Sequence, residues 1–336
     1  MERQRQIESW LKEIHPGRGM VLSPASADAS FRRYFRASFA DGASAIVMDA
    51  PPEREDCRPW LAVQRLFRAA GVLVPEVLAE DLERGFLLIS DLGSSTYLQS
   101  LAGATPAQAA ALYADATAAL VRLQAASRPG PLPAYDQALL QRELELFPEW
   151  YLSRHLGASL TAAQREILDQ AFSKILAVNL AEAQVFVHRD YHSRNLMNID
   201  GSGNPGVIDF QDAVYGPISY DLVSLFKDAY IAWDEELTLD WLIRYWEAAR
   251  HASLPVPGDF AEFHRNYEWM GVQRHLKVLG IFARLYHRDG KSGYLADMPR
   301  VAKHLRQACA RYRELGPLLQ LLDELEARQT QVAYSF

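Results

Sequence analysis

The residues best suited to chemistry are two aspartates and an asparagine that border short apolar runs in the second half of the chain. Asp190 follows the apolar run 185–187, Asn195 stands five positions later, and Asp209 closes the run 207–208. If these runs are strands and the last two form a hairpin, Asn195 and Asp209 lie side by side at one end of it. A carboxylate can accept the proton of an attacking hydroxyl, and carboxylate and amide oxygens are ligands that Mg²⁺ prefers.

Phosphoryl transfer needs such a set, because it depends on positioning and on neutralisation of charge. The run His188-Arg189-Asp190-Tyr191-His192-Ser193-Arg194-Asn195 has the spacing His-Arg-Asp-x-x-x-x-Asn of a kinase catalytic loop, and Asp209-Phe210-Gln211 stands where kinases carry Asp-Phe-Gly. Loop caps and surface roles remain open for His192 and Asp212. The three residues Asp190, Asn195 and Asp209 together favour a kinase-like site.

The two motifs together resemble the aminoglycoside phosphotransferase family, which shares the protein-kinase-like fold, and the similarity spans nearly the whole chain. The resemblance implies that Asp190 is the catalytic base and that Asn195 and Asp209 bind Mg²⁺. It also implies that His188 braces the loop. Asp221, in the run Gly-Pro-Ile-Ser-Tyr-Asp-Leu, matches a family aspartate that holds the loop backbone.

The expected nucleotide side departs from the usual kinase pattern. Residues 25–31 stand where a glycine-rich loop is expected but contain no glycine, and Met48 replaces the phosphate-binding lysine. The following helix offers Gln64 in place of the glutamate partner, so both halves of that ion pair are missing, and a buried glutamate without its lysine would be costly. We expect arginines near residues 32–36 to supply the charge, although at least half of them are expected to be solvated at strand edges.

Strand alternation puts Arg32, Tyr34 and Arg36 on one face and Arg33 and Phe35 on the other. The resemblance places adenine against the main chain of a hinge at residues 88–92. The expected nucleotide-binding residues are therefore Ser30, Phe31, Arg32, Arg33, Met48, Ser90 and Leu92.

The segment 27–36, Met48 and the run 143–151 (Glu-Leu-Glu-Leu-Phe-Pro-Glu-Trp-Tyr) resemble one branch of the family. That branch phosphorylates the anomeric hydroxyl of N-acetylmuramate and N-acetylglucosamine in cell-wall recycling. The resemblance implies a small sugar as partner, with ATP and Mg²⁺. The candidates for sugar contacts are His192, Glu149, Trp233 and Arg274, although packing or surface roles are equally open for each, and an arginine would suit the muramate carboxylate.

A protein acceptor is not expected, because only a short stretch separates Asp209 from Asp221 and no Ala-Pro-Glu-like anchor follows. Two other functions stay open. One is an aminoglycoside- or choline-type kinase, whose cationic acceptor would need an acidic pocket. The other is a catalytically silent ATP-binding scaffold, suggested by the missing lysine.

The apolar periodicity predicts an α+β chain with a two-lobe organisation, and the resemblance implies that this is the protein-kinase-like fold. Residues 1–91 form a small antiparallel β-lobe with helices at 7–14 and 59–70. Residues 92–336 form a larger, mainly helical lobe with a β-hairpin insert. The expected strands of the first lobe are 20–22, 33–39, 45–49, 72–79 and 86–90, and the expected helices of the second are 106–124, 139–156, 162–180, 219–232, 238–249, 259–287 and 298–329.

Composition narrows the classes of protein further. The 336 residues carry a net charge of −7 and show no basic stripe, so we expect no nucleic-acid partner. The two cysteines, Cys57 and Cys309, form no metal-binding pattern and are expected as free thiols. No window approaches the roughly 20 apolar residues of a membrane helix, and no secretory signal is recognised at the start, so we expect no membrane contact and a cytoplasmic location.

Overall fold

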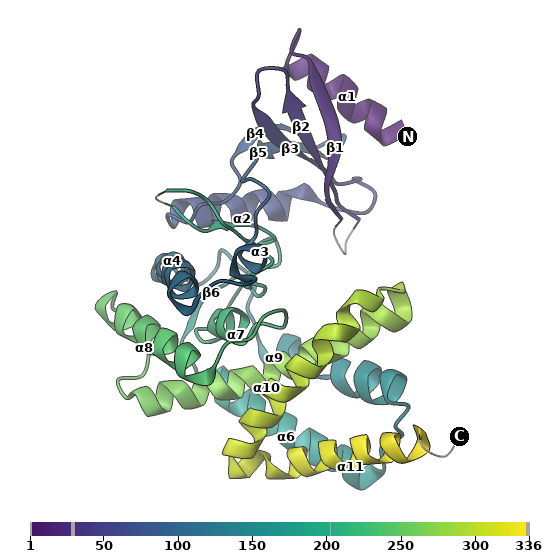
Figure 1. Cartoon of the computed structure of the whole chain (residues 1–336), viewed down its shortest axis with the longest axis vertical. Helices are drawn as coiled ribbons and strands as arrows, with labels where there is room; N and C mark the ends of the chain where they lie inside the picture. The colour runs from purple at the N-terminus through teal and green to yellow at the C-terminus, as the bar shows by residue number, and fades with distance from the viewer. Residues whose placement is uncertain (1, 28–30, 202, 334–336) are drawn as a thin grey trace. The chain divides into compact units, whose positions relative to one another are not determined.

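The structure, a computed structural model, describes residues 2–27, 31–201 and 203–333, so Ser30 of the expected nucleotide loop lies outside the described residues. It has an antiparallel sheet near the N-terminus and a mainly helical remainder, which confirms the expected α+β fold (Figure 1). The chain divides into two compact units. One comprises Met1–Ser100 with Arg194–Asp212, and the other Leu101–Ser193 with Ala213–Phe336.

The first unit is built on a five-stranded antiparallel sheet of order β1-β2-β3-β5-β4. The Asp41-Gly42 turn joins β2 to β3, and Gly42 takes the positive φ (85°) that such a turn requires. The strands are β1 (Met20–Ala27), β2 (Arg33–Phe39), β3 (Ser44–Asp49), β4 (Val77–Asp81) and β5 (Phe86–Ser90), and the helices are α1 (Glu2–Ile14), α2 (Cys57–Ala69) and α3 (Tyr97–Leu101).

Helix α1 packs on one face of this sheet through Ile7, Trp10 and Leu11, as its apolar spacing predicts. The strand residues beneath it include Ala37, Val47 and Leu88, with Phe35 at the margin. Because side chains alternate along a strand, Met48 and its cross-strand partner Tyr34 lie on the opposite face. One face of the sheet is therefore covered by α1.

The hairpin 194–212 belongs to the first unit, although the sequence analysis assigns it to the second lobe. Its strands β7 (Leu196–Met197) and β8 (Gly206–Val207) pair with each other, and Val207 donates its N–H to the Leu73 carbonyl at 2.7 Å. The Phe210 ring lies 5.0 Å from Trp60 and 5.7 Å from Phe67 of α2, between ring centroids. These long-range contacts have no local sequence signal.

The second unit is helical, with a two-stranded sheet of β6 and β9. Thr105 and Thr161 begin their helices with capping boxes, each with glutamine three residues later. Its elements are α4 (Pro106–Ala125), α5 (Gln137–Leu144), η1 (Phe147–His155), α6 (Ala162–Leu180), β6 (Gln184–Val187), β9 (Val214–Pro217), α7 (Tyr220–Phe226), α8 (Glu235–His251), α9 (Phe260–Asp289), η2 (Ser292–Asp297), α10 (Met298–Arg311), η3 (Arg313–Leu315) and α11 (Gly316–Ala333).

Several predicted elements were wrong in extent. The helix expected at 139–156 is α5 followed by the π-helix η1, and the one expected at 298–329 breaks at residues 312–315, just before Gly316-Pro317. The helix expected at 219–232 ends at Phe226, the strand expected at 72–79 begins at Val77, and β9 was not predicted. No helix among the described residues has the length and apolar character to cross a membrane.

Two histidine rings stack inside the second unit. His275 of α9 and His304 of α10 lie 5.3 Å apart between centroids at an interplanar angle of 19°. Burial, aided by the nearby positive charge of Lys227, lowers the pKa of His304 to about 4 and that of His275 well below its usual value. The fold therefore requires both rings to be neutral.

This requirement predicts a loss of stability in mild acid. The unfolded chain takes up protons near pH 6.5 that the folded protein excludes. The contribution of the two neutral rings to the free energy of unfolding is complete above that pH. For each histidine it declines by about 1.4 kcal/mol per pH unit as the pH falls from about 6.5 toward 4. His304→Phe should retain the stacking and make the thermal midpoint less dependent on pH between 7.5 and 5.5. The control His251→Gln, at an exposed position, should leave the pH dependence of the thermal midpoint unchanged. Equal pH dependence in the two variants would contradict the explanation.

Candidate active site

The loop that carries Asp190 begins directly after β6 in the second unit. His188 is fully buried, and its Nδ1 accepts the N–H of Asp190 at 3.2 Å. Arg189 has a positive φ of 75°, which is rare for a residue with a long side chain. Backbone strain of this kind persists only where the surroundings enforce it, and it is typical of functional sites.

Two buried aspartates hold the backbone of this loop. Asp221 of α7 accepts the N–H groups of His188 at 2.7 Å and Arg189 at 3.0 Å, which are the contacts that a support for the loop would make. Burial raises the pKa of Asp221 to about 6, although these hydrogen bonds oppose the shift. Asp228 accepts the N–H of Ser193 at 2.9 Å.

A buried ion network fixes the Arg189 side chain. Glu143 of α5 is 5% exposed and accepts hydrogen bonds from Arg189 and from the Tyr135 hydroxyl, and Lys277 of α9 lies 3.0 Å from it. Burial alone would raise the pKa of Glu143, but the charges of Lys277 and Arg189 outweigh it and lower the pKa. The carboxylate is therefore ionised, and its two cations come from the catalytic loop and from α9.

Arg274, one turn before Lys277 on α9, meets the proposed base directly. Its guanidinium donates to the Arg189 carbonyl at 2.6 Å and lies 3.4 Å from Asp190 Oδ1. Burial alone would raise the pKa of Asp190, but the positive charges of Arg274 and Lys277 outweigh it and lower the pKa below its usual value. The side chain is still 43% exposed, so an ionised carboxylate is available to a ligand.

Asn195 and Asp209 lie side by side in the first unit. The Asn195 amide donates to Asp209 Oδ2 at 3.2 Å, and Gln211 donates to Asp209 Oδ1 at 3.0 Å. Asp209 also has a positive φ, 63°. One carboxylate and one amide oxygen fit Mg²⁺, which keeps waters and phosphate oxygens as its other ligands. Over the part of the chain that the structure describes, no three His, Cys, Asp or Glu side chains form a closed metal cage.

The structure separates the two adjacent arginines of the expected phosphate site. Arg33 forms an ion pair with Asp49, which is fully buried and is also bound by Arg3 of α1. Arg33 therefore lies on the sheet face that α1 covers, opposite to Met48. Arg32 directly precedes β2, and its charge acts on the Cys57 thiol in the first turn of α2. Of the two, Arg32 has the position that suits the face of Met48.

The other expected nucleotide residues have mixed surroundings. Phe31 is 57% exposed and donates its N–H to Glu55, whereas Met48 is fully buried. Ser90 accepts the N–H of Glu76 at 2.8 Å through its hydroxyl. Leu92 lies so close to Gly206 that a Cβ there would stand 2.9 Å from its methyl carbon. The hinge residues Ser90 and Leu92 therefore contact neighbouring segments of the first unit.

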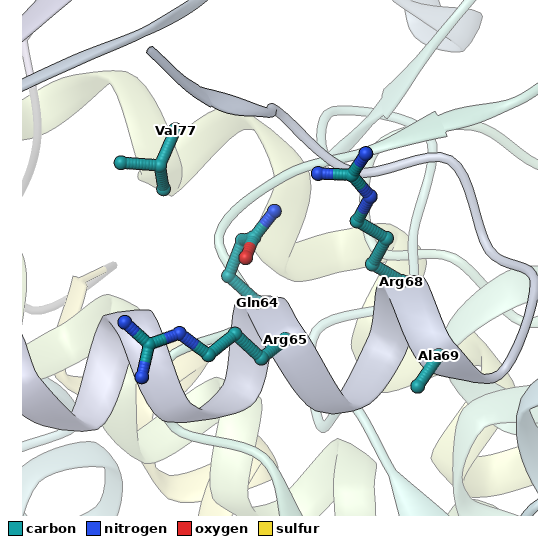
Figure 2. Close-up of a pocket in the computed structure, with 5 residues that line it drawn as sticks. All are labelled: Gln64, Arg65, Arg68, Ala69 and Val77. Carbon is teal, nitrogen blue, oxygen red and sulfur yellow. The ribbon is translucent and has the colours of Figure 1, made fainter. Parts of the chain in front are cut away.

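Gln64, which replaces the expected glutamate, ties α2 to the chain before β4. Its amide donates to the Pro75 carbonyl at 2.9 Å. Gln64 also lines a hollow of about 500 Å³ with Val77 and with three other residues of α2 (Figure 2). One of these, Arg68, pairs with Glu76 at 2.9 Å. Of the expected nucleotide residues that the structure describes, none lines this hollow.

The candidates for sugar contacts differ in the interactions that they already make within the protein. The Trp233 indole donates to the Tyr113 hydroxyl at 3.1 Å within an aromatic cluster. His192 is buried, donates its N–H to the Asp190 carbonyl at 3.0 Å and lies edge-on to Tyr230. Glu149 is exposed on η1. His192 is thus placed next to Asp190, whereas the Trp233 indole is already bonded to Tyr113.

A model of the phosphotransferase enzyme family matches residues 21–263. The chain belongs to this family. It is 52% identical over 328 residues to a protein of Neisseria meningitidis serogroup B named N-acetylmuramate/N-acetylglucosamine kinase, with 97% of this chain and 96% of that protein covered. A protein of Pseudomonas aeruginosa with the same name is 49% identical over 96% of each chain.

Solved structures of this phosphotransferase fold agree with the architecture. A choline kinase from Streptococcus pneumoniae has a TM-score of 0.65 at 13% identity, with 93% of this chain and all of that chain covered. An ADP-bound aminoglycoside phosphotransferase has a TM-score of 0.59 at 15% identity, covering 89% of this chain and 97% of that one. At such identities the likeness shows the fold alone, and that fold is kinase-like as expected.

Sequence reasoning on this phosphotransferase named Asp221 as a support of the loop but missed that Asp228, Glu143 and Lys277 support it. Asp228 belongs to no recognised motif, although it lies only seven residues after Asp221 in the sequence. Lys277 was missed because a lysine inside a long amphipathic helix normally indicates a solvated face. The burial of Glu143, which makes its carboxylate need cations, is seen only in the structure.

Proposed function

We propose that the chain transfers the γ-phosphate of ATP, with Mg²⁺, to the anomeric hydroxyl of N-acetylmuramate and N-acetylglucosamine. The setting is the cytoplasmic recycling of peptidoglycan. The observation that carries the proposal is Asp190, an exposed and ionised carboxylate that Arg274 holds in a strained loop. Support for the substrates comes from relatives at about half identity over nearly the full chain, whose names state these two sugars.

Asp190 has the properties of a positioning base. Its carboxylate can accept the hydrogen bond of the acceptor hydroxyl and direct the oxygen toward the phosphoryl group. A carboxylate of lowered pKa is a weak base, and it suits an acceptor that is more acidic than an ordinary alcohol. The hemiacetal hydroxyl of a sugar is such an acceptor, because the ring oxygen withdraws electrons from the anomeric carbon.

Asn195 and Asp209 supply oxygen ligands on the phosphate side. When bound there, Mg²⁺ would neutralise charge on the transferring phosphoryl group. The Asn195 amide now donates to Asp209 and would present its carbonyl oxygen after a flip about the side-chain torsion. Gln211 retains its hydrogen bond to the second Asp209 oxygen and keeps the carboxylate oriented.

The charges near Asp190 disfavour the two other functions that the sequence leaves open. Arg189, Arg274 and Lys277 all act on this carboxylate, so the acceptor side has positive charges that would oppose a cationic aminoglycoside or choline. A silent ATP-binding scaffold would have no need for the strained backbone at Arg189 or at Asp209. A sugar, neutral or acidic, fits these surroundings better.

A coupled ADP-release assay with a panel of acceptors tests the proposal. Both amino sugars should be phosphorylated, and kanamycin and choline should not. Asp190→Asn should reduce kcat by a factor on the order of hundreds, because the amide cannot accept the proton. The matched control Asp200→Asn, in an exposed turn, should retain activity.

Transfer to kanamycin or choline but not to the sugars would overturn the proposal. Binding of ATP without transfer to any acceptor would favour the scaffold. Undiminished turnover of Asp190→Asn would remove this residue from its role.

The two adjacent arginines give a second test, on the nucleotide side. We propose that Arg32 provides charge for the phosphates, so Arg32→Ala should raise the KM for ATP by about tenfold. Arg33→Ala should instead leave Asp49 with Arg3 alone and lower the free energy of unfolding by about 1 kcal/mol or more. Steady-state kinetics and thermal melts separate these effects. An unchanged KM for ATP in Arg32→Ala would exclude the residue.

A further inference from the structure

Arg284 of α9 is a partly buried cation without a counter-ion among the described residues. Its Nε atom is buried and has no hydrogen-bond partner, and the side chain makes no ion pair or ring contact with the described part of the chain. Arg288 repels it, while Asp289 and Glu149 attract it from beyond ion-pair distance. Its surroundings in the folded protein are therefore electrostatically unfavourable.

Other arginines of the molecule show how unusual this is. Burial and the charge of Arg288 lower the pKa of Arg284, whereas every other arginine with a resolved shift among the described residues has a raised pKa, for example Arg165 beside Glu145. An arginine cannot release its proton to escape the cost. Binding an anion would remove the cost, because a desolvated charge gains most from a partner.

The position of Arg284 on α9 places it on the side of the proposed base. Residues 274, 277, 281 and 284 follow the helical spacing of three and four and share one face. Arg274 contacts Asp190, and Lys277 contacts Glu143, on that face. Ten residues span about 15 Å along a helix, and the side chains of Arg274 and Arg284 both slope toward its N-terminus.

The same part of α9 packs against the start of η1. A Cβ on Gly280 would stand 2.5 Å from the backbone of Leu146, so only glycine permits this approach. Glu149 lies in the first turn of η1, and its charge acts on Arg284. The run 143–151, which the sequence marks as characteristic, therefore contributes Glu143 to the ion network and Glu149 to the surroundings of Arg284.

The two proposed sugars differ at one group that an arginine recognises. N-acetylmuramate carries a lactyl ether with a carboxylate at C3, whereas N-acetylglucosamine has a hydroxyl there. About seven covalent bonds separate the anomeric oxygen from that carboxylate, a reach of up to about 9 Å. A guanidinium binds a carboxylate through two parallel hydrogen bonds.

We propose that Arg284 binds the lactyl carboxylate of N-acetylmuramate and so sets the preference of the enzyme for the acidic sugar over the neutral one. The inference rests on the proposed function. It replaces Arg274 in the role of carboxylate ligand, because Arg274 already donates to the Arg189 carbonyl and to the Tyr220 hydroxyl and lies against Asp190.

Comparison of the two sugars within one variant tests this inference. Arg284→Gln should reduce kcat/KM for N-acetylmuramate by about ten- to hundredfold, mainly through KM, because the contact lies away from the reacting atoms. The kcat/KM for N-acetylglucosamine should change by less than about twofold, within the range of surface substitutions. Arg244→Gln on α8 is the control; it removes an exposed arginine that pairs with Asp240 and should change neither value.

The methyl ester of N-acetylmuramate provides a chemical counterpart. The wild type should lose the same factor on the ester as Arg284→Gln loses on the acid, and Arg284→Gln should not distinguish ester from acid. Equal losses on both sugars, with a lowered thermal midpoint, would show a structural role and overturn the inference, as would unchanged kinetics on N-acetylmuramate. If the wild type phosphorylated neither sugar, the proposed function itself would fall.

Discussion

The buried carboxylate of Glu143 is the constraint on which the catalytic loop depends. An ionised group that is 5% exposed must keep its cations, because an uncompensated buried charge costs several kcal/mol. One of those cations is Arg189, the residue before Asp190, and the other is Lys277, one turn from Arg274 on α9. The requirement of Glu143 therefore pins the Arg189 side chain, and Asp221 and Arg274 fix the loop backbone. Together they enforce the positive φ at Arg189.

The same network determines which acceptor fits. Glu143 neutralises part of the charge of Arg189 and Lys277, yet enough remains to keep Asp190 ionised. A weak base beside positive charge suits an acidic hydroxyl on a neutral or anionic molecule. Further along α9, Arg284 continues the positive face without a carboxylate of its own. One face of α9 thus supplies Arg274 beside the base, Lys277 in the network and Arg284, and the run 143–151 supplies Glu143 and Glu149.

Local patterns predicted much of this molecule, and long-range pairing accounts for the rest. The spacing from His188 to Asn195 and the period of α1 are local signals, and each predicted its motif or element. The break before Gly316-Pro317 had a local signal that the apolar period masked. No local signal shows that 194–212 pairs with Leu73 or that Asp49 binds Arg33. The sequence does not distinguish an arginine that contacts the proposed base, such as Arg274, from one such as Arg284 that lacks a partner among the described residues.

The central claim is that Arg274, held within the Glu143 network, keeps Asp190 ionised as the base. The direct measurement is the pH profile of kcat/KM for N-acetylglucosamine at saturating MgATP, in the wild type and in Arg274→Gln, with thermal melts to confirm folding. The account predicts that the wild type shows no acid limb from Asp190 above about pH 5. In Arg274→Gln the limb should move to higher pH by about one unit or more, because an opposite charge within about 4–6 Å shifts a pKa by one to three units. An acid limb that does not move in a folded Arg274→Gln variant would contradict the account.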